Sequence, residues 1–148
     1  MTLNVKMVKE ADKYAPAYAN LTDACMDLKI KIPEGKYTLK PQEIKTFGTG
    51  LQVSVPENYV MLAFPRSSTG IKLNCMLSNT TGVIDNGFKD EIKMSLYNFG
   101  TDEIELTDAQ RIAQFMIIPR PLINPIFVED DEEFRKGDRG GGIGSTGK

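Results

Sequence analysis

Short runs of alternating apolar and polar residues, separated by glycines and prolines, make up most of this sequence. The chain has 13 glycines and 8 prolines in 148 residues, and helix-favouring segments are few. Alternation with a period of two is typical of strands that turn one face to a core, and β-branched residues favour the same conformation. The pattern predicts a single all-β domain of many short strands with at most one short helix.

The predicted strands are bounded by turn residues. Strands are expected at 5–8, 36–40, in two pieces around Gly48 and Gly50 within 43–55, after the turn in 56–65, and at 103–106. Ser67 or Ser68 is expected to cap a short helical turn after Pro65. The runs 79–85 and 91–97 flank Asn86 and Gly87 and predict a hairpin. Residues 111–118 are apolar enough to be a buried strand or a helix, and periodicity does not decide between them.

Length, charge and cysteine content limit the class of protein. With 41% hydrophobic residues and a net charge of −2, the chain can bury one core but does not resemble a non-specific nucleic-acid or lipid-surface binder. No apolar run reaches the length of a signal peptide or a membrane span, so we expect a soluble cytoplasmic protein with no membrane contact. Cys25 and Cys75 are far apart and indicate buried thiols in a reducing compartment.

Histidine is absent, which limits the chemistry open to an active site. Ser-His-Asp triads, Cys-His pairs and histidine-based metal sites are all excluded. Catalysis, if present, depends on carboxylates, hydroxyls, cations or a metal ion held by oxygen atoms.

Four segments carry candidate chemistry, and each also fits a plainer structural role. Two cations and three hydroxyls in 66–72 could bind phosphates, or could form a capped turn with solvated charges. Asp85 ends an apolar run, where burial would raise its basicity, but a surface turn gives the same pattern. Asp27 is either a functional carboxylate or a turn cap. Arg111 and Gln114 would face opposite sides of a regular strand, so that one could reach a ligand.

The C-terminal segment differs from the rest in composition. Residues 1–128 read as the β domain, whereas 129–148 read as an acidic run followed by a glycine-rich mobile arm. The end of the arm matches the GxxxxGK part of a P-loop, but no helix follows Lys148, so that interpretation fails. The composition still fits either a solubilising tail or an arm that closes over an anion.

In chain order, these segments resemble the five motifs of the trimeric dUTP pyrophosphatases (dUTPases). The matching segments are 24–28, 65–68 with Gly70 and Lys72, 82–85 with Phe88 and Glu91, 111–114, and 139–147. The resemblance implies a distorted β-barrel or jelly-roll (β-clip) subunit and a homotrimer with three active sites at subunit interfaces. The implied reaction is the hydrolysis of dUTP to dUMP and pyrophosphate.

The resemblance also implies roles for individual residues. Asp85 would activate the water that attacks the α-phosphorus, and Ser67 would hydrogen-bond the phosphate chain. Asp27 would position water bound to Mg²⁺, and the other ligands of the Mg²⁺ ion would be the substrate phosphates. The implied phosphate-binding residues are Arg66, Ser67, Ser68, Gln114, Arg139, Ser145 and Thr146. The implied uracil and deoxyribose contacts are Asn79, Gly82, Ile84, Asp85, Phe88 and Lys93.

The sequence departs from the family pattern at several positions. Cys25, Asp90 and the pair Ala109-Gln110 replace residues that are usually glycine, glycine and Gly-Asp. The arm is one residue shorter than usual, and Ile143 stands where the family has a phenylalanine that stacks on uracil. The base is then covered either by Ile143 or by an aromatic residue of the body, with Tyr97, Phe99 and Phe134 as candidates.

Two other functions compete with this interpretation. A dCTP deaminase shares the implied fold, but its proton-shuttling glutamate is replaced here by Ser95. A nucleotide-binding regulator that captures a partner protein would not need Asp85, Ser67 and Gln114 all to be present.

Overall fold

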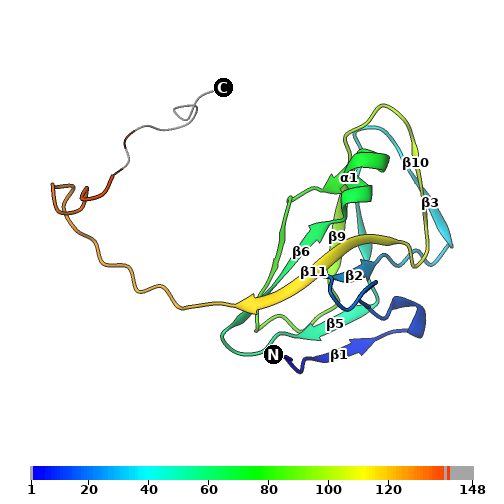
Figure 1. Cartoon of the computed structure of the whole chain (residues 1–148). Helices are drawn as coiled ribbons and strands as arrows, with labels where there is room; N and C mark the ends of the chain where they lie inside the picture. The colour runs from blue at the N-terminus through cyan, green and yellow to red at the C-terminus, as the bar shows by residue number, and fades with distance from the viewer. Residues whose placement is uncertain (1, 139, 141–148) are drawn as a thin grey trace.

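Within residues 2–138 and 140, which the computed structural model describes, the chain forms eleven short strands, one α-helix and one 3₁₀ turn (Figure 1). The strands are β1 (Lys6–Lys9), β2 (Met26–Lys29), β3 (Lys36–Leu39), β4 (Ile44–Gly48), β5 (Leu51–Ser54), β6 (Tyr59–Pro65), β7 (Cys75–Leu77), β8 (Gly82–Ile84), β9 (Lys93–Asn98), β10 (Ile104–Thr107) and β11 (Arg111–Pro119). The helix α1 spans Ser67–Leu73, and the 3₁₀ turn η1 spans Asp12–Tyr14. The predicted all-β class with one short helix is confirmed, with η1 as an addition.

All strand pairs are antiparallel and fall into four small sheets. The largest has the order β2-β11-β6-β8 and the next β4-β9-β7, while β1 pairs with β5 and β10 with β3. One cluster of buried apolar side chains joins these sheets, with Leu28, Leu51, Met61, Leu96 and Leu106 fully covered. This is a jelly-roll-like arrangement, and the described strands do not close into a barrel.

The apolar run 111–118 is a strand, which settles the question that its periodicity left open. β11 pairs with β2 along one edge and with β6 along the other, so it lies inside its sheet. Ile112, Ala113 and Phe115 are buried as a consequence. Met116, Ile117 and Ile118 are half-buried, so neither face of this part of the strand is fully exposed, and clear alternation is absent.

For residues 79–97, the predicted turn is correct, but the predicted pairing of the two strands that flank it is wrong. The Phe88 N–H donates to the Asp85 carbonyl at 3.1 Å, which closes a turn around Asn86 and Gly87. The flanking strands do not pair with each other, because β8 pairs with β6 whereas β9 pairs with β4 and β7. The turn therefore links two different sheets, and the loop of residues 85–92 spans the space between them.

Two smaller expectations also need correction. Arg66, in an extended conformation, is the N-cap of α1, and Ser67 is already the first helical residue, so neither serine caps the helix. The chain leaves β6 at Pro65 and enters the helix at once, which leaves no room for a serine cap. Cys75 is buried as predicted, and burial raises the pKa of its thiol to about 11. Cys25 is only half-buried.

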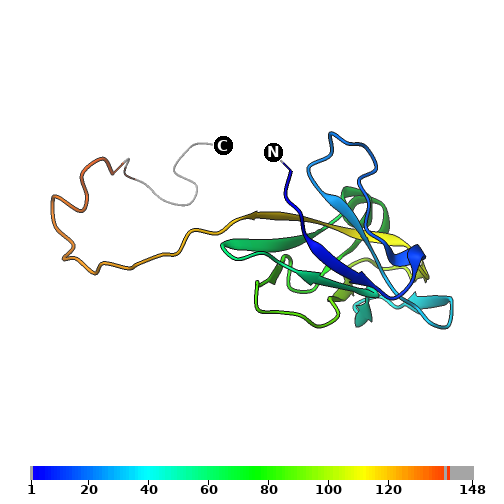
Figure 2. The same cartoon turned by 90° about the horizontal axis from the view of Figure 1, so that it is seen from below.

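After β11 the chain leaves the body of the fold. Residues 120–138, in the described part of the chain, carry no strand and run away from the sheets in both views (Figures 1 and 2). Their large apolar side chains are exposed: Leu122, Ile123, Ile126, Phe127 and Val128. No helix in the described part of the chain has the length and apolar character needed to cross a membrane.

Candidate active site

Asp27 is the centre of a charged cluster at the end of β6. Its carboxylate is 2.9 Å from Arg66 Nε and 3.1 Å from Arg111 Nη1, and the residue is only 8% exposed. Arg66 also donates from Nη1 to the Arg111 carbonyl at 3.1 Å. The carboxylate orients both guanidinium groups, and a buried carboxylate with two charged donors forms strong hydrogen bonds.

The sheet register explains why these residues meet. Asp27 on β2 stands opposite Gln114 on β11, and the register shifts between Arg111 and Ala113. Because of this shift, Arg111 and Gln114 both lie beside Asp27, and Arg111 donates a hydrogen bond to its carboxylate. The expectation that Arg111 and Gln114 face opposite sides of the strand is therefore wrong. The Gln114 side chain donates to the Pro65 carbonyl at 3.2 Å and links β11 to the start of α1.

The hydroxyls at the start of α1 differ in exposure. Ser67 is exposed and Ser68 is half-buried. Thr69 is buried, and its hydroxyl donates to the Ile112 carbonyl at 2.7 Å. Thr69 therefore fastens the helix to β11, while Ser67 and Ser68 remain available to a ligand. This cluster brings together four predicted phosphate-binding residues: Arg66, Ser67, Ser68 and Gln114.

A second group of predicted residues surrounds a small cavity between the two larger sheets. The cavity has a volume of about 180 Å³, and its lining includes Asn79, Gly82, Ile84 and Lys93. Gly82 has room for little else, since a Cβ there would lie 3.3 Å from that of Ala63. The cavity exists because β8 and β9 diverge into different sheets. Residues of β8 and β9 are part of its lining, and strand backbone can offer fixed donors and acceptors.

Asp85 and Phe88 lie beside this cavity on the loop that follows β8. A shallower hollow of about 170 Å³ is lined by both residues together with Val83, Ile84, Ile92 and Lys93. Asp85 is exposed in the single chain, so the burial expected from its apolar neighbours is absent there. Phe88 is 41% exposed.

The two groups are far apart within one chain. Ile84, next to Asp85, pairs with Met61, which precedes Arg66 by five residues on β6. Five residues of strand span roughly 17 Å. Within one chain, the predicted general base is therefore distant from the predicted phosphate-binding cations.

The remaining predicted residues belong to the end of the arm. Arg139, Ser145 and Thr146, together with Ile143, lie outside the described residues. Their predicted roles stay predictions.

A metal site of the protein alone would need several ligands among the side chains of residues 2–138 and 140. No group of three or more acidic or cysteine residues in this part of the chain could hold an ion. Both oxygens of Asp27 already contact guanidinium groups. The donor set fits a metal ion that arrives on an anionic ligand and reaches Asp27 through water, which matches the preference of Mg²⁺ for oxygen atoms and retained water.

Four residues of the site region were not predicted to line the cavity or to hold the loop beside it. Ser78 and Ser95 line the base-sized cavity, and the Ser95 hydroxyl is 2.5 Å from that of Thr46. Lys89 and Glu91 hold the loop after β8 against β5. Alternation could have marked Ser95 as half-buried, but no local signal identifies the partners of Lys89 or Glu91.

Comparison with known proteins identifies the family. The dUTPase family model matches residues 11–147, which is nearly the whole chain. The chain belongs to the dUTPase family. The order of its five motif segments along the sequence agrees with this assignment.

Curated relatives span the full length of this dUTPase. A deoxyuridine 5'-triphosphate nucleotidohydrolase of Caldanaerobacter subterraneus subsp. tengcongensis is 35% identical over 150 residues, covering 99% of this chain and 98% of the relative. One from Francisella tularensis subsp. holarctica is 35% identical over 149 residues, covering 99% of each chain.

Solved dUTPase structures have the same fold. A mutant of the phage 80alpha dUTPase has a TM-score of 0.78 at 24% identity and covers 96% of this chain and 99% of its own. A mutant dUTPase of phage phi11 of S. aureus, studied for the coordination of a structural Mg(II) ion, has a TM-score of 0.76 at 21% identity, with coverage of 88% and 99%. At these identities the likeness establishes the fold alone.

Proposed function

We propose that this dUTPase hydrolyses dUTP to dUMP and pyrophosphate, with Asp85 as the general base that activates the attacking water. The observation that carries the proposal is the position of Asp85 directly after β8, beside a cavity of about 180 Å³ that is lined by residues of β8 and β9. A carboxylate at the mouth of a base-sized cavity can act on the first phosphate of a nucleotide whose base fills that cavity.

The cavity supports selection of uracil and deoxyribose. Backbone donors and acceptors of β8 and β9 can form hydrogen bonds to a pyrimidine edge, and a narrow cavity leaves no space for the methyl group of thymine. Phe88 supplies a ring face against the sugar, where a 2′-hydroxyl would lack both space and a partner. Asn79, Gly82, Ile84 and Lys93 complete the proposed contacts.

The charged cluster supports phosphate binding. The two guanidinium groups that Asp27 orients can neutralise a triphosphate, and Arg66 offers paired donors that suit phosphate oxygens. Ser67 would donate a hydrogen bond to the phosphate chain near the scissile bond, with support from Ser68 and Gln114. Such preorganised donors stabilise the charge that develops during phosphoanhydride hydrolysis.

Mg²⁺ is the proposed cofactor. When bound to the triphosphate, the ion withdraws charge from the phosphate oxygens and so favours nucleophilic attack. Asp27 would hold water on the ion, while its ion pairs with Arg66 and Arg111 fix the orientation of the carboxylate.

We propose further that the active form is a homotrimer with sites shared between chains. The first support is the separation of roughly 17 Å along β6 between the Asp85 loop and the Arg66 cluster. A site that uses both groups on one triphosphate is most simply assembled from the loop of one chain and the cluster of a neighbour. In the proposed assembly, the arm of residues 129–148 completes a neighbouring site with Arg139, Ser145 and Thr146.

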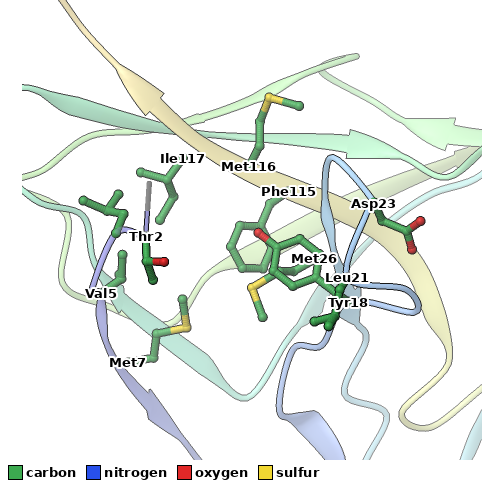
Figure 3. Close-up of a pocket in the computed structure, with 11 residues that line it drawn as sticks. Thr2, Val5, Met7, Tyr18, Leu21, Asp23, Met26, Phe115, Met116 and Ile117 are labelled. Carbon is green, nitrogen blue, oxygen red and sulfur yellow. The ribbon is translucent and has the colours of Figure 1, made fainter.

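The second support is the exposed apolar segment 122–128. It leaves the body after β11, and Phe127 is 93% exposed and Ile123 88% exposed. The body carries an open apolar groove of about 620 Å³ between the N-terminal residues, the loop before β2, and β11 (Figure 3). Val5, Met7, Met26, Phe115 and Ile117 line it. Since the segment points away from its own groove, we propose that it fills the groove of a second copy.

The test of the activity is a comparison of nucleotides. The protein is incubated with Mg²⁺ and with dUTP, dCTP, dTTP or UTP, and the products are identified. Pyrophosphate released from dUTP alone is the expected result. Ammonia from dCTP would instead establish a deaminase, although no Asp or Glu among the described residues lines the cavity that holds Ser95.

Replacing Phe127 with aspartate is expected to disrupt the trimer. Burial of an aromatic side chain contributes about 1.5–3 kcal/mol per chain, and a buried charge in its place is unfavourable. Light scattering of the wild type should give three times the chain mass of 16.4 kDa, and of the variant mainly the single-chain mass. Phe134→Asp, an exposed aromatic beyond this segment, is the control and should remain trimeric. An active wild type with the mass of one chain would contradict the proposed assembly.

A further inference from the structure

The loop of residues 85–92 is held in place by polar contacts with β5 and its flanking residues. Residues 85–90 are all exposed, and β8 and β9 do not pair with each other, so neither core packing nor a strand ladder fixes this part of the loop, whereas Ile92 at its end is buried in the core. The Asn86 side chain donates to the Val55 carbonyl at 3.4 Å. Lys89 Nζ donates to Ser54 Oγ at 3.1 Å and to the Asn86 carbonyl at 2.6 Å. The position of Asp85 therefore depends on these anchors.

Glu91 makes the strongest of these contacts. Its Oε1 accepts a hydrogen bond of 2.8 Å from the Gly50 N–H and lies 3.0 Å from Lys31 Nζ. Burial tends to raise the pKa of this carboxyl, but the Gly50 N–H, Lys31 and the Thr49 backbone outweigh burial, and the net pKa is lowered. Glu91 is therefore ionised at neutral pH, when charge-assisted hydrogen bonds are strongest.

The surroundings of Glu91 form a specific receptor for its carboxylate. A Cβ at Gly48 would lie 2.5 Å from Glu91 Oε1, so only glycine at this position leaves room for the carboxylate. The neighbouring Ile92 is held at both backbone groups, because its N–H donates to the Leu51 carbonyl at 2.9 Å and its carbonyl accepts from Thr49 Oγ1 at 2.8 Å. Glu91 is therefore followed by a residue whose N–H and carbonyl are both hydrogen-bonded to the 49–51 segment.

We propose that Glu91 is a positioning residue for catalysis, which holds the loop that carries Asp85 and Phe88 in its working position. The inference rests on the proposed role of Asp85 as general base. Glu91 contacts Gly50 and Lys31 and lies against Gly48 of β4, and it lines neither of the two hollows beside Asp85, so it acts only through the loop. Misplacement of a catalytic group by about 1 Å can reduce the rate on the order of 10²-fold.

Three substitutions separate this role from a general effect on stability. Glu91→Ala removes the anchor and should lower kcat by about 10- to 100-fold, with a smaller change in KM. Glu91→Gln keeps an acceptor for the Gly50 N–H and should restore most of kcat. Glu10→Gln is the matched control, because Glu10 is the other carboxylate bound to Lys31, at 2.6 Å, and does not contact the loop. This control should turn over dUTP at the wild-type rate.

Gly48→Ala displaces the carboxylate without altering Glu91 itself. Gly48 does not have a positive φ, so the substitution acts through the close approach to Glu91. We expect Gly48→Ala to reproduce the loss of kcat seen in Glu91→Ala, and the double variant to lose no more than either single variant. Thermal unfolding and light scattering of each variant report whether fold and assembly are retained.

The outcomes distinguish this inference from the proposed function. If Asp85→Asn is inactive while folded Glu91→Ala keeps its wild-type kcat, the positioning role is wrong and the function stands. If Asp85→Asn remains fully active, the proposed mechanism fails first. If Glu91→Ala does not fold, Glu91→Gln still decides the question. A kcat of Glu91→Gln as low as that of Gly48→Ala would overturn the inference. A double variant of the two positions whose loss of kcat is the product of the two single losses would also overturn it.

Discussion

The Asp85→Asn variant is expected to hydrolyse dUTP roughly 10²–10⁴-fold more slowly than the wild type while binding it almost as well. The amide has nearly the shape of the carboxylate and can still accept a hydrogen bond from water, but it cannot take up a proton. The cavity beside β8 and the cation cluster around Arg66 are both unchanged. Pyrophosphate release measures turnover, and calorimetry with a non-hydrolysable dUTP analogue measures binding.

A control for charge is available on the same loop. Asp90 is exposed and lies five residues beyond Asp85, so Asp90→Asn removes an equal charge from the same region. It should leave turnover nearly unchanged. Wild-type turnover in Asp85→Asn would refute the proposed mechanism, and equal losses in both variants would point to a general electrostatic effect.

Removal of residues 139–148 is expected to abolish most turnover without unfolding the protein. The deletion takes away the Arg139 guanidinium and the glycine-rich backbone that would close over the phosphates, but leaves Asp85 and Ser67 intact. The segment has almost no apolar side chains and adds little to a core. Unchanged circular dichroism and an unchanged number of chains in the assembly, together with a steep loss of kcat, are the expected results.

Mixed assemblies test whether the arm acts between chains. Chains with Asp85→Asn are combined with chains truncated before Arg139, and each preparation alone should be inactive. Activity should reappear in the mixture if the arm of one chain closes over a site whose Asp85 belongs to another. Full activity of the truncated chain alone would show that the arm is only a tail. The proposed roles of Arg139, Ser145 and Thr146 would then be wrong.

Most strands could be predicted from the sequence because they depend on local chemistry. The predicted runs at 36–40 and 103–106 correspond to β3 and β10, and the break at Gly50 separates β4 from β5. Gly50 has φ +62, a conformation that side chains other than glycine adopt only with strain, so the break is encoded at one residue. Alternation and turn residues act within a few positions, and a sequence displays them directly.

The missed elements depend on partners distant in sequence. The short strands β2 and β7 lack a clear alternating pattern, and they exist because β11 and β9 supply their hydrogen-bond partners. The failed hairpin has the same cause. The turn at Asn86 and Gly87 is local and was correctly predicted, but the pairing of β8 with β6 is decided by the sheet as a whole.

The site divides in the same way. The sequence alone determined the all-β class, the absence of histidine chemistry, and the motif residues that mark the dUTPase family. Only the tertiary structure decided that Asp27 binds two guanidinium groups, that Asp85 lies roughly 17 Å along β6 from that cluster, and that Glu91 anchors the loop through Gly50. The physical reason is that residue type and short-range periodicity are properties of neighbours in the chain. Ion pairs, cavities and strand order arise between segments that folding brings together, and no local pattern specifies which segments these are.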